Sequence, residues 1–234
     1  MRSAAVSGRF YPSDPAELRD VVTTLLADAK LKARPPAHFR AVIAPHAGYV
    51  YSGPTAAAVF ARARLPELIV ILAPNHTGIC DAEGGASLWP DGAFRTPLGD
   101  VPVDAPFAAA LLAESPLVAV DHEAHRLEHA IEVELPFIQA VQPRARIVPL
   151  VLAWDDWTPA RALGDALARL VRAAREPVLL LASSDLNHYE PAAVSERKDA
   201  RVLAAVLALD GADVLARCRR ERITMCGRAP VATV

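Results

Sequence analysis

Short apolar segments alternate with longer amphipathic segments along this chain. The short segments span five to eight residues, are rich in Val, Ile and Leu, and carry apolar side chains at nearly every position. An uninterrupted apolar run of this length is typical of a strand buried on both faces of a sheet, whereas a strand with one face in water alternates polar and apolar residues. We therefore predict buried strands at 40–44, 68–73, 146–153 and 177–182.

The longer segments between these strands have the spacing of amphipathic helices. Leu and Val recur in them every three or four residues, which places the apolar side chains on one stripe of a helix. The first segment begins with Asp14 and Glu17, a pair that predicts a capping box. Strands that alternate with helices of this length indicate an α/β fold with a mainly parallel central sheet flanked by helices. The predicted helices cover 14–30, 158–175 and 199–209.

Composition narrows the class of protein. The chain has 234 residues, of which 53% are hydrophobic and 22% charged, and this excludes a disordered protein. The length and the even composition favour one domain over 1–234. The net charge of −2 provides no basic footprint, so no nucleic-acid partner is expected. No apolar run approaches the roughly 20 residues of a membrane-spanning helix, so no membrane partner is expected.

Cysteine usage suggests where the protein works. Three cysteines in a chain of this length do not form a disulfide scaffold. The first ten residues also lack the apolar core of a secretory signal. Free cysteines are typical of a reducing compartment, and we therefore expect a cytoplasmic protein.

Three histidines follow three different predicted strands. His46 comes two residues after the first strand and His76 three residues after the second, while His188 lies six residues beyond the last. In an open α/β sheet, ligands bind beyond the carboxyl ends of the strands, and these ends share one edge when the strands are parallel. A lone histidine near a strand end is usually a capping or core residue. Three with the same placement favour a site.

The chemistry of such a site depends on what joins the histidines. Imidazole suits zinc, iron or copper, and a carboxylate or thiolate would complete the ligand set. Cys226 ends the apolar run 223–227 together with a glycine, which predicts a strand end with a close backbone approach. A buried small hydrophobe is the alternative for this cysteine. Cys80 is a second possible ligand, whereas Cys218 lies between arginines and is expected on a helix surface. Spacing alone leaves this choice open.

Asp185 precedes His188 by three residues. A carboxylate at this distance could orient the imidazole and raise its basicity, which makes His188 a candidate for proton transfer. The alternative is that Asp185 caps the segment that follows it.

A competing motif lies at His125–His129, which fits the H-x-x-E-H pattern of inverted zincins. In those zinc peptidases two histidines on one helix bind the metal and the glutamate activates water. Glu132 and Glu134 would extend an acidic helical face. A five-residue match arises easily by chance, and the peptidase hypothesis leaves the strand-end histidines unexplained. We rank it below the strand-end site.

Six short sequence blocks follow one another along the chain. They are P-H-A-G-Y at 45–49, P-N-H-T-G at 74–78, T-P-L-G-D at 96–100, E-H-A-I-E at 128–132, S-S-D-L-N-H-Y at 183–189 and C-G-R-A-P at 226–230. No single block would be specific, but their order and spacing resemble the Memo family, whose prokaryotic members are also called AmmeMemoRadiSam system protein B. The resemblance covers essentially the whole chain, and G-R-F-Y-P at 8–12 matches the family's opening block.

The resemblance implies a three-layer fold related to class III extradiol ring-cleavage dioxygenases, which hold Fe(II) with two histidines and a carboxylate. In the Memo family a cysteine replaces the carboxylate. Carried over to this sequence, the metal ligands would be His46, His76 and Cys226. The resemblance favours iron or copper as the cofactor, with zinc also compatible.

The resemblance also implies roles for residues around the metal. Asp185 and His188 match the family's nearby Asp and His, and His188 corresponds to the acid/base histidine of the dioxygenases. Tyr49, Glu128 and His129 match positions in the pocket wall or behind the ligands.

Function is expected to follow the same resemblance. It implies a metal-dependent oxidoreductase that performs redox or oxygen chemistry on a small molecule or peptide, with a radical SAM protein and an AMMECR1-type protein as partners. The alternative is a non-catalytic module that binds a peptide or a partner protein in the same pocket. Family members usually continue beyond the Cys-Gly block with a further helix and strand, and we expect this chain, which ends at Val234, to lack that unit.

Overall fold

A six-stranded sheet forms the centre of the computed structural model, which describes residues 1–32 and 34–234. Its strand order is β1-β8-β2-β7-β3-β6; β1, β8, β2 and β7 run parallel, and β3 pairs antiparallel to β7 and parallel to β6. The predicted, mainly parallel sheet is confirmed. The strands are β1 (Ala41–Ala44), β2 (Leu68–Pro74), β3 (Ala86–Leu88), β6 (Val118–Val120), β7 (Arg146–Leu152) and β8 (Val178–Ser183).

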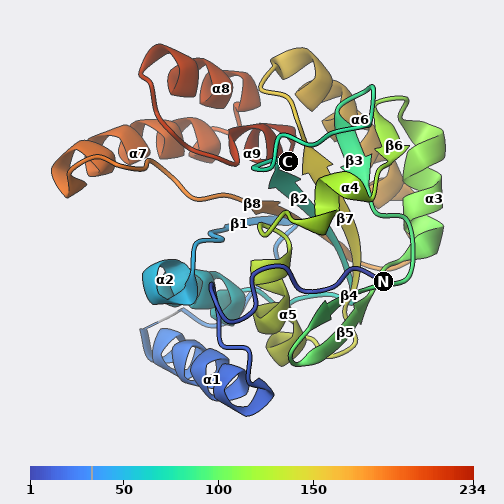
Figure 1. Cartoon of the computed structure of the whole chain (residues 1–234). Helices are drawn as coiled ribbons and strands as arrows, with labels where there is room; N and C mark the ends of the chain where they lie inside the picture. Colours follow the sequence, from blue (N-terminus) through green and yellow to red (C-terminus); the bar gives the residue numbers. More distant parts are fainter. Residues whose placement is uncertain (33) are drawn as a thin grey trace.

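Helices cover both faces of the sheet, which gives the three expected layers (Figure 1). One layer contains α1 (Pro15–Lys32), α2 (Tyr49–Arg62) and α5 (Leu135–Val141). The other contains α3 (Ala105–Glu114), α6 (Trp157–Ala173), α7 (Ala192–Leu207), α8 (Gly211–Arg220) and α9 (Arg228–Thr233). The three helices predicted from the sequence correspond to α1, α6 and α7.

The side chains of the central strands explain their uninterrupted apolar sequence. Ile69 and Ile71 of β2 pack into the core beneath α1, α2 and α5, while Val70 and Leu72 pack beneath α3 and α6. All four are fully buried. Successive side chains of a strand point to opposite faces, so a strand covered on both sides needs apolar residues at every position.

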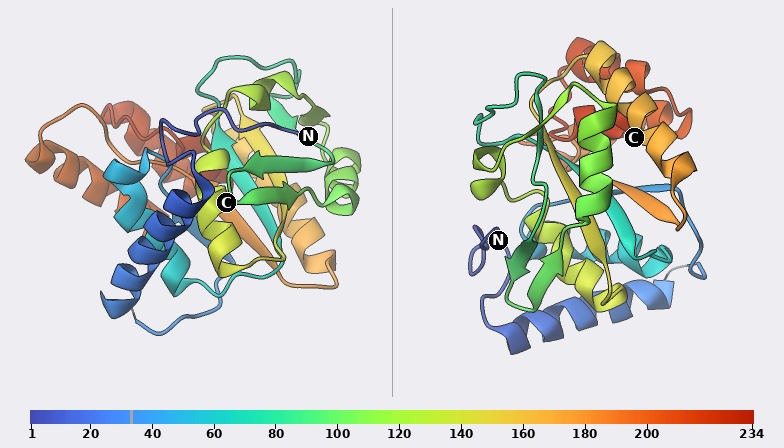
Figure 2. Two further views of the ribbon diagram at one scale, coloured as in Figure 1. Left: turned by 60° about the horizontal axis from the view of Figure 1, so that its bottom comes forward. Right: turned by 90° about the vertical axis from the view of Figure 1, so that its right-hand side faces the viewer.

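The remaining elements lie beside the sheet. A hairpin of β4 (Ala93–Thr96) and β5 (Gly99–Pro102) turns at Gly99, whose φ of 122° suits glycine. The N-terminal segment runs along this hairpin, where the Arg2 amide donates to the Ala93 carbonyl (Figure 2). The short helix α4 (Glu123–Arg126) and the 3-10 helix η1 (Glu132–Glu134) precede α5. None of the described helices combines the length and apolar character needed to cross a membrane.

Two local predictions are wrong: the strand at 223–227 and the surface position of Cys218. In both cases the side chains concerned pack into the core. Residues 223–227 form no strand. Ile223 and Met225 are apolar because they pack into the core between α7 and α8. Cys218 does lie in a helix, but on its buried side beside Val202 and Val214. Of the neighbouring arginines of the amphipathic helix α8, Arg219 and Arg220 are exposed and Arg217 is half-buried.

Candidate metal centre

The site forms where three neighbouring parallel strands end. The chain leaves β1 through Pro45 to His46, leaves β2 to His76, and leaves β8 to Asp185 and His188. Since β8 lies between β1 and β2 in the sheet, these loops meet at one edge. The His46 and His76 ring centres are 5.1 Å apart. The predicted convergence of the strand-end histidines is confirmed for this pair.

Cys226 reaches the same edge from the loop before α9. Its Sγ lies 3.2 Å from His46 Nε2. The loop approaches β8 so closely that a Cβ on Gly227 would stand 2.3 Å from the Ser183 carbonyl oxygen, and the Gly227 amide donates to Ser184 Oγ. The close backbone approach predicted from the Cys-Gly pair is therefore present, although no strand carries it.

The donor atoms brought together are of the kinds that transition metals prefer. The ligand atoms of His46, His76 and Cys226 all lie within 4.8 Å of one another. Two imidazole nitrogens and a sulfur suit zinc, iron or copper. Two further groups of described residues meet the same distance limit: His76, Glu128 and His129, and Asp185, His188 and Cys226.

His46 is the most buried member of the site, with 1% of its surface exposed. Its Nδ1 lies 2.7 Å from Ser183 Oγ. Burial lowers the pKa of His46 well below its usual range, and the nearby His76, His129 and His188 lower it further. The neutral imidazole, which is the form that binds a metal, is therefore the stable form here.

Glu128 orients the second histidine from behind. Its carboxylate accepts hydrogen bonds from His76 Nδ1 at 2.9 Å, from the His76 amide at 2.6 Å and from the Ala130 amide at 2.9 Å. Burial acts to raise the pKa of Glu128, but these hydrogen bonds and the charge of His76 lower it overall. Burial also acts to lower the pKa of His76, yet Cys226 and Glu128 raise it to about 10.

His129 covers one side of the site. Its ring stacks on His76 with centres 4.6 Å apart, and Phe10 packs 4.7 Å from it. Burial lowers the pKa of His129. Glu128 and His129 therefore both contact His76, one through a hydrogen bond and the other through its ring.

Asp185 and His188 lie beside His46 and Cys226, but Asp185 does not hold His188. Their closest charged atoms are 3.8 Å apart, which is beyond hydrogen-bond distance. Asp185 Oδ1 instead accepts from the amides of His46 and Ala47, and so fixes the loop after β1. His188 Nδ1 donates to the Thr224 carbonyl at 2.9 Å. Thr224 carried no sequence signal, because its backbone oxygen makes this contact.

Tyr49 lies outside the site. It belongs to the first turn of α2, is 5% exposed, and packs between Tyr11 and Phe137. Its hydroxyl donates to the Val133 carbonyl at 2.8 Å. Tyr49 is therefore a core residue that supports the segment following His129. It does not line the pocket wall, which was one of the two positions expected for it.

The zinc-peptidase hypothesis fails on geometry. Helix α4 ends at Arg126, so His125 and His129 do not share a helix face. The His125 side chain turns into the core, where its Nε2 donates to the Ser87 carbonyl at 2.9 Å. Cys80 is also absent from the candidate metal groups of the described residues; its Sγ lies 3.6 Å from Ser87 Oγ.

Glu132 and Glu134 do not form an exposed acidic face either, since both are fully buried. Glu132 pairs with Arg2, and Glu134 contacts Ser183. Periodicity alone could not separate a solvated acidic face from two buried carboxyl groups, because their partners come from distant segments.

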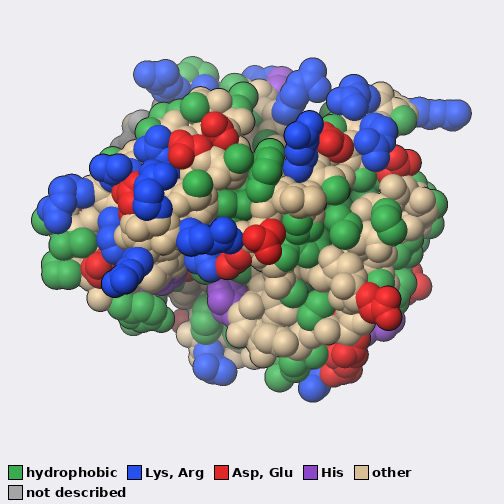
Figure 3. Space-filling model, turned by 90° about the horizontal axis from the view of Figure 1, so that it is seen from above, with side chains coloured by type: hydrophobic (Ala, Val, Ile, Leu, Met, Phe, Trp, Pro, Cys, Tyr) green, Lys and Arg blue, Asp and Glu red, His purple; other side chains and the backbone are tan. Residues whose placement is uncertain are grey.

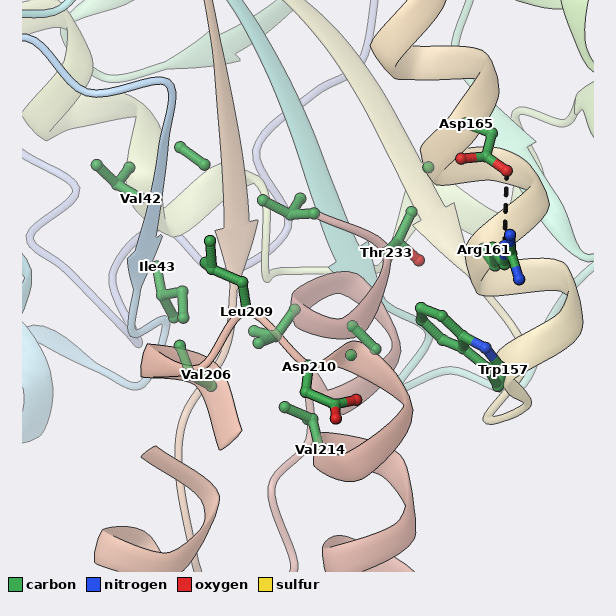
Figure 4. A pocket seen from close by; sticks show the side chains of 16 residues that line it. Val42, Ile43, Trp157, Arg161, Asp165, Val206, Leu209, Asp210, Val214 and Thr233 are labelled. Atoms are coloured by element: carbon green, nitrogen blue, oxygen red, sulfur yellow. Dashed lines mark ion pairs between the residues drawn. The ribbon is translucent and has the colours of Figure 1, made fainter. Parts of the chain in front are cut away.

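A cleft lies beside Cys226. It has a volume of about 540 Å³. A separate groove of about 510 Å³ between β1, α6 and α9 has no histidine in its lining (Figure 4). On the face above α7 and α8, basic side chains lie next to acidic ones, and a histidine is visible beside a hollow (Figure 3). The cleft beside Cys226 is lined by Asn75, Trp154, Asp155 and Arg228, among others.

Fold and site together define an α/β protein with a histidine–cysteine centre at the carboxyl edge of its parallel strands. The sequence matches the family described as "Memo-like protein" over residues 2–234, and the chain belongs to the Memo family. It is 40% identical to a MEMO1 family protein of Methanopyrus kandleri, over 99% of this chain and 84% of the relative. It is 38% identical to one of Thermotoga maritima, over 100% and 87%. A third, from Methanothermobacter thermautotrophicus, is 37% identical over 99% and 86%.

Proposed function

We propose that this protein binds a single metal ion through His46, His76 and Cys226. The observation that carries the proposal is the way the rings are held. Nδ1 of His46 faces Ser183, and Nδ1 of His76 faces Glu128, so each ring presents its other nitrogen, Nε2, to Cys226. Metal-binding histidines are typically held in this way, with the second ring nitrogen fixed by a protein group.

The ligand set decides which metals are favoured. Two imidazoles and a thiolate form a softer set than two imidazoles and a carboxylate, and they suit iron, copper and zinc. Iron and copper change oxidation state, and they are the favoured ions for the redox chemistry that the family resemblance implies. When bound, such an ion supplies Lewis acidity and one-electron chemistry.

The residues beside the proposed ligands support a role as a metal-dependent oxidoreductase. His188 is partly exposed and anchored through Nδ1, so its Nε2 is available to take or give a proton. Asp185 keeps the His46 loop in place through two backbone amides. The cleft beside Cys226 is large enough for a small-molecule substrate. A cytoplasmic location and partnership with radical SAM and AMMECR1-type proteins stay predictions.

Elemental analysis after anaerobic purification tests the metal site. We expect about one metal ion per chain in the native protein, and its loss in His46→Ala, His76→Ala and Cys226→Ser. Cys80→Ser is the matched control, because this cysteine lies outside the proposed ligand set, and it should keep the metal. A native protein without metal, or equal metal content in Cys226→Ser and Cys80→Ser, would contradict the proposal.

Oxygen consumption with candidate small molecules then tests catalysis. The metal-loaded native protein should consume oxygen with some substrate, and His188→Gln should keep the metal while losing most of the rate. A protein that binds metal and a peptide saturably without any turnover would instead support the alternative of a binding module.

A further inference from the structure

Ser183 Oγ has three polar neighbours at the end of β8. The Ala130 carbonyl oxygen and His46 Nδ1 each lie 2.7 Å away, and Glu134 Oε1 lies 3.0 Å away. All four residues are buried. Each of these contacts is short enough to require a hydrogen between the two heavy atoms.

Counting hydrogens fixes the direction of every bond in this cluster. The Ser183 hydroxyl has one hydrogen to donate and two lone pairs to accept with. A backbone carbonyl can only accept, so the Ser183 hydrogen must point to Ala130 O. The two other contacts then need hydrogens from their partners, one from His46 Nδ1 and one from the Glu134 carboxyl group.

We infer that Glu134 is a neutral carboxylic acid that, through Ser183, holds His46 with its proton on Nδ1 and its Nε2 lone pair open toward Cys226. Glu134 is thus a positioning residue behind a proposed metal ligand. The inference deepens the proposed function, on which only its consequence for metal binding rests.

The surroundings of Glu134 agree with a neutral acid. The residue is fully buried, and its Oε2 has no hydrogen-bond partner among the described residues. Burial raises the pKa of Glu134 well above its usual range, and the charge of Asp185 acts in the same direction. Among the described residues no cation pairs with Glu134, whereas Glu132, two residues earlier, is paired with Arg2. An unpaired buried carboxylate would be very costly, and protonation avoids that cost.

The arrangement has a consequence for the metal site. A neutral acid behind His46 fixes the ring without adding a further negative charge to a site that already contains Asp185 and Cys226. The proton on Nδ1 leaves Nε2 as the atom that binds, and it is the atom 3.2 Å from Cys226 Sγ.

Infrared spectroscopy of the metal-free protein tests the protonation of Glu134. At pH 7 the native protein should show the C=O band of a buried neutral carboxyl group, and Glu134→Gln should remove it. Glu128→Gln is the matched control and should leave the band in place, because the Glu128 carboxylate accepts four N–H bonds. If the native protein and Glu134→Gln showed the same C=O bands, the inference would be overturned.

Nitrogen-15 NMR of the metal-free protein tests the tautomer of His46. We expect the proton on Nδ1 in the native protein and in Glu134→Gln, because a Gln amide can still donate to Ser183 Oγ. Glu134→Leu and Ser183→Ala should give a mixture of tautomers. A native His46 protonated only on Nε2 would overturn the inference.

Cobalt(II) titration measures the consequence. Glu134→Leu should weaken binding about tenfold, as loss of a group behind a metal ligand does, while Glu134→Gln should bind like the native protein. Equal weakening in both variants would mean that a carboxylate is needed and would contradict the neutral acid. If the native protein binds no metal, the proposed function fails, but the infrared and NMR results still decide the state of Glu134 and His46.

Discussion

Two buried polar regions flank the segment that contains Glu128 and Glu132, and they are built differently. On one side, the Glu132 carboxylate receives hydrogen bonds from Arg2, Tyr11 and the amides of Ala5 and Val6. On the other side lies the proposed metal centre, where imidazole nitrogens and a thiol sulfur face one another.

The difference lies in how donors and acceptors are matched. In this Glu132 network the four donors named above each meet a carboxylate oxygen, so the network can hold the chain in place. In the metal centre the nitrogen and sulfur atoms of His46, His76 and Cys226 converge on one another instead. A cation would satisfy all of them at once. The Glu132 network therefore has the composition of a structural hydrogen-bond network, and the metal centre has the composition of a ligand site, although both are rich in buried polar groups.

The largest expected effect is a loss of stability on breaking the Glu132 network. Arg2→Met removes the cation from fully buried Glu132 and the hydrogen bonds to the carbonyls of His125 and Glu128. Loss of one partner of a buried ion pair costs about 3–5 kcal/mol of unfolding free energy, which urea denaturation measures.

The exposed pair between Arg95 and Asp100 is the control for that experiment. Arg95→Ala should leave the unfolding midpoint nearly unchanged, because solvent screens the pair. If the two variants lost equal stability, the distinction between a buried ion-pair network and an exposed ion pair would fail.

A smaller effect on stability is expected from His125, whose carbonyl oxygen accepts a hydrogen bond from Arg2 in the Glu132 network. Burial lowers its pKa to about 4, and the hydrogen bond to the Ser87 carbonyl only partly opposes this. In the unfolded chain a histidine titrates near 6.5. As the pH falls from about 6.5 toward 4, the unfolded chain binds a proton that the folded protein does not, so stability present above pH 6.5 is lost.

The variant His125→Phe removes this titration. The stability lost between pH 7 and pH 4.5 should be about 2–3 kcal/mol smaller in the variant than in the native protein. Urea unfolding at the two pH values measures the difference. The variant should also retain its metal, and equal acid sensitivity in both proteins would contradict the buried neutral state of His125.

On the metal-centre side the expected effects are on binding. Glu128→Gln weakens the hydrogen bond to His76 Nδ1 while preserving the shape of the side chain. Metal affinity should fall about 10–100-fold, as measured by cobalt(II) titration, while the unfolding midpoint changes little. A large loss of stability with unchanged metal affinity would instead assign Glu128 a structural role, like that of Glu132.

Much of the fold was predictable because it depends on local pattern. The four predicted strands and three predicted helices are present, since residues buried on both faces of a sheet must be apolar at every position. The approach of His46 to His76 was also predictable, because both residues follow parallel strands and such strands end at the same edge.

Other features required contacts between distant segments. Tyr49 was expected at the site, but the start of α2 turns its ring into the core. The H-x-x-E-H segment looked helical, but α4 ends after one turn and sends His125 inward and Glu128 toward His76. Glu134 looked like an exposed carboxylate, and only its contact with Ser183 assigns it a role.

The sequence by itself determined the α/β architecture and the family, because these follow from periodicity and ordered motifs. It also predicted the residues that we propose as metal ligands. Tertiary structure alone decided which polar side chains are held by hydrogen bonds and ion pairs and which converge at the metal centre. That decision depends on partners such as Arg2, Ser183 and Thr224, which reach the site from separate segments. Hydrogen bonds are made between atoms in space, and the chain order does not specify which atoms will meet.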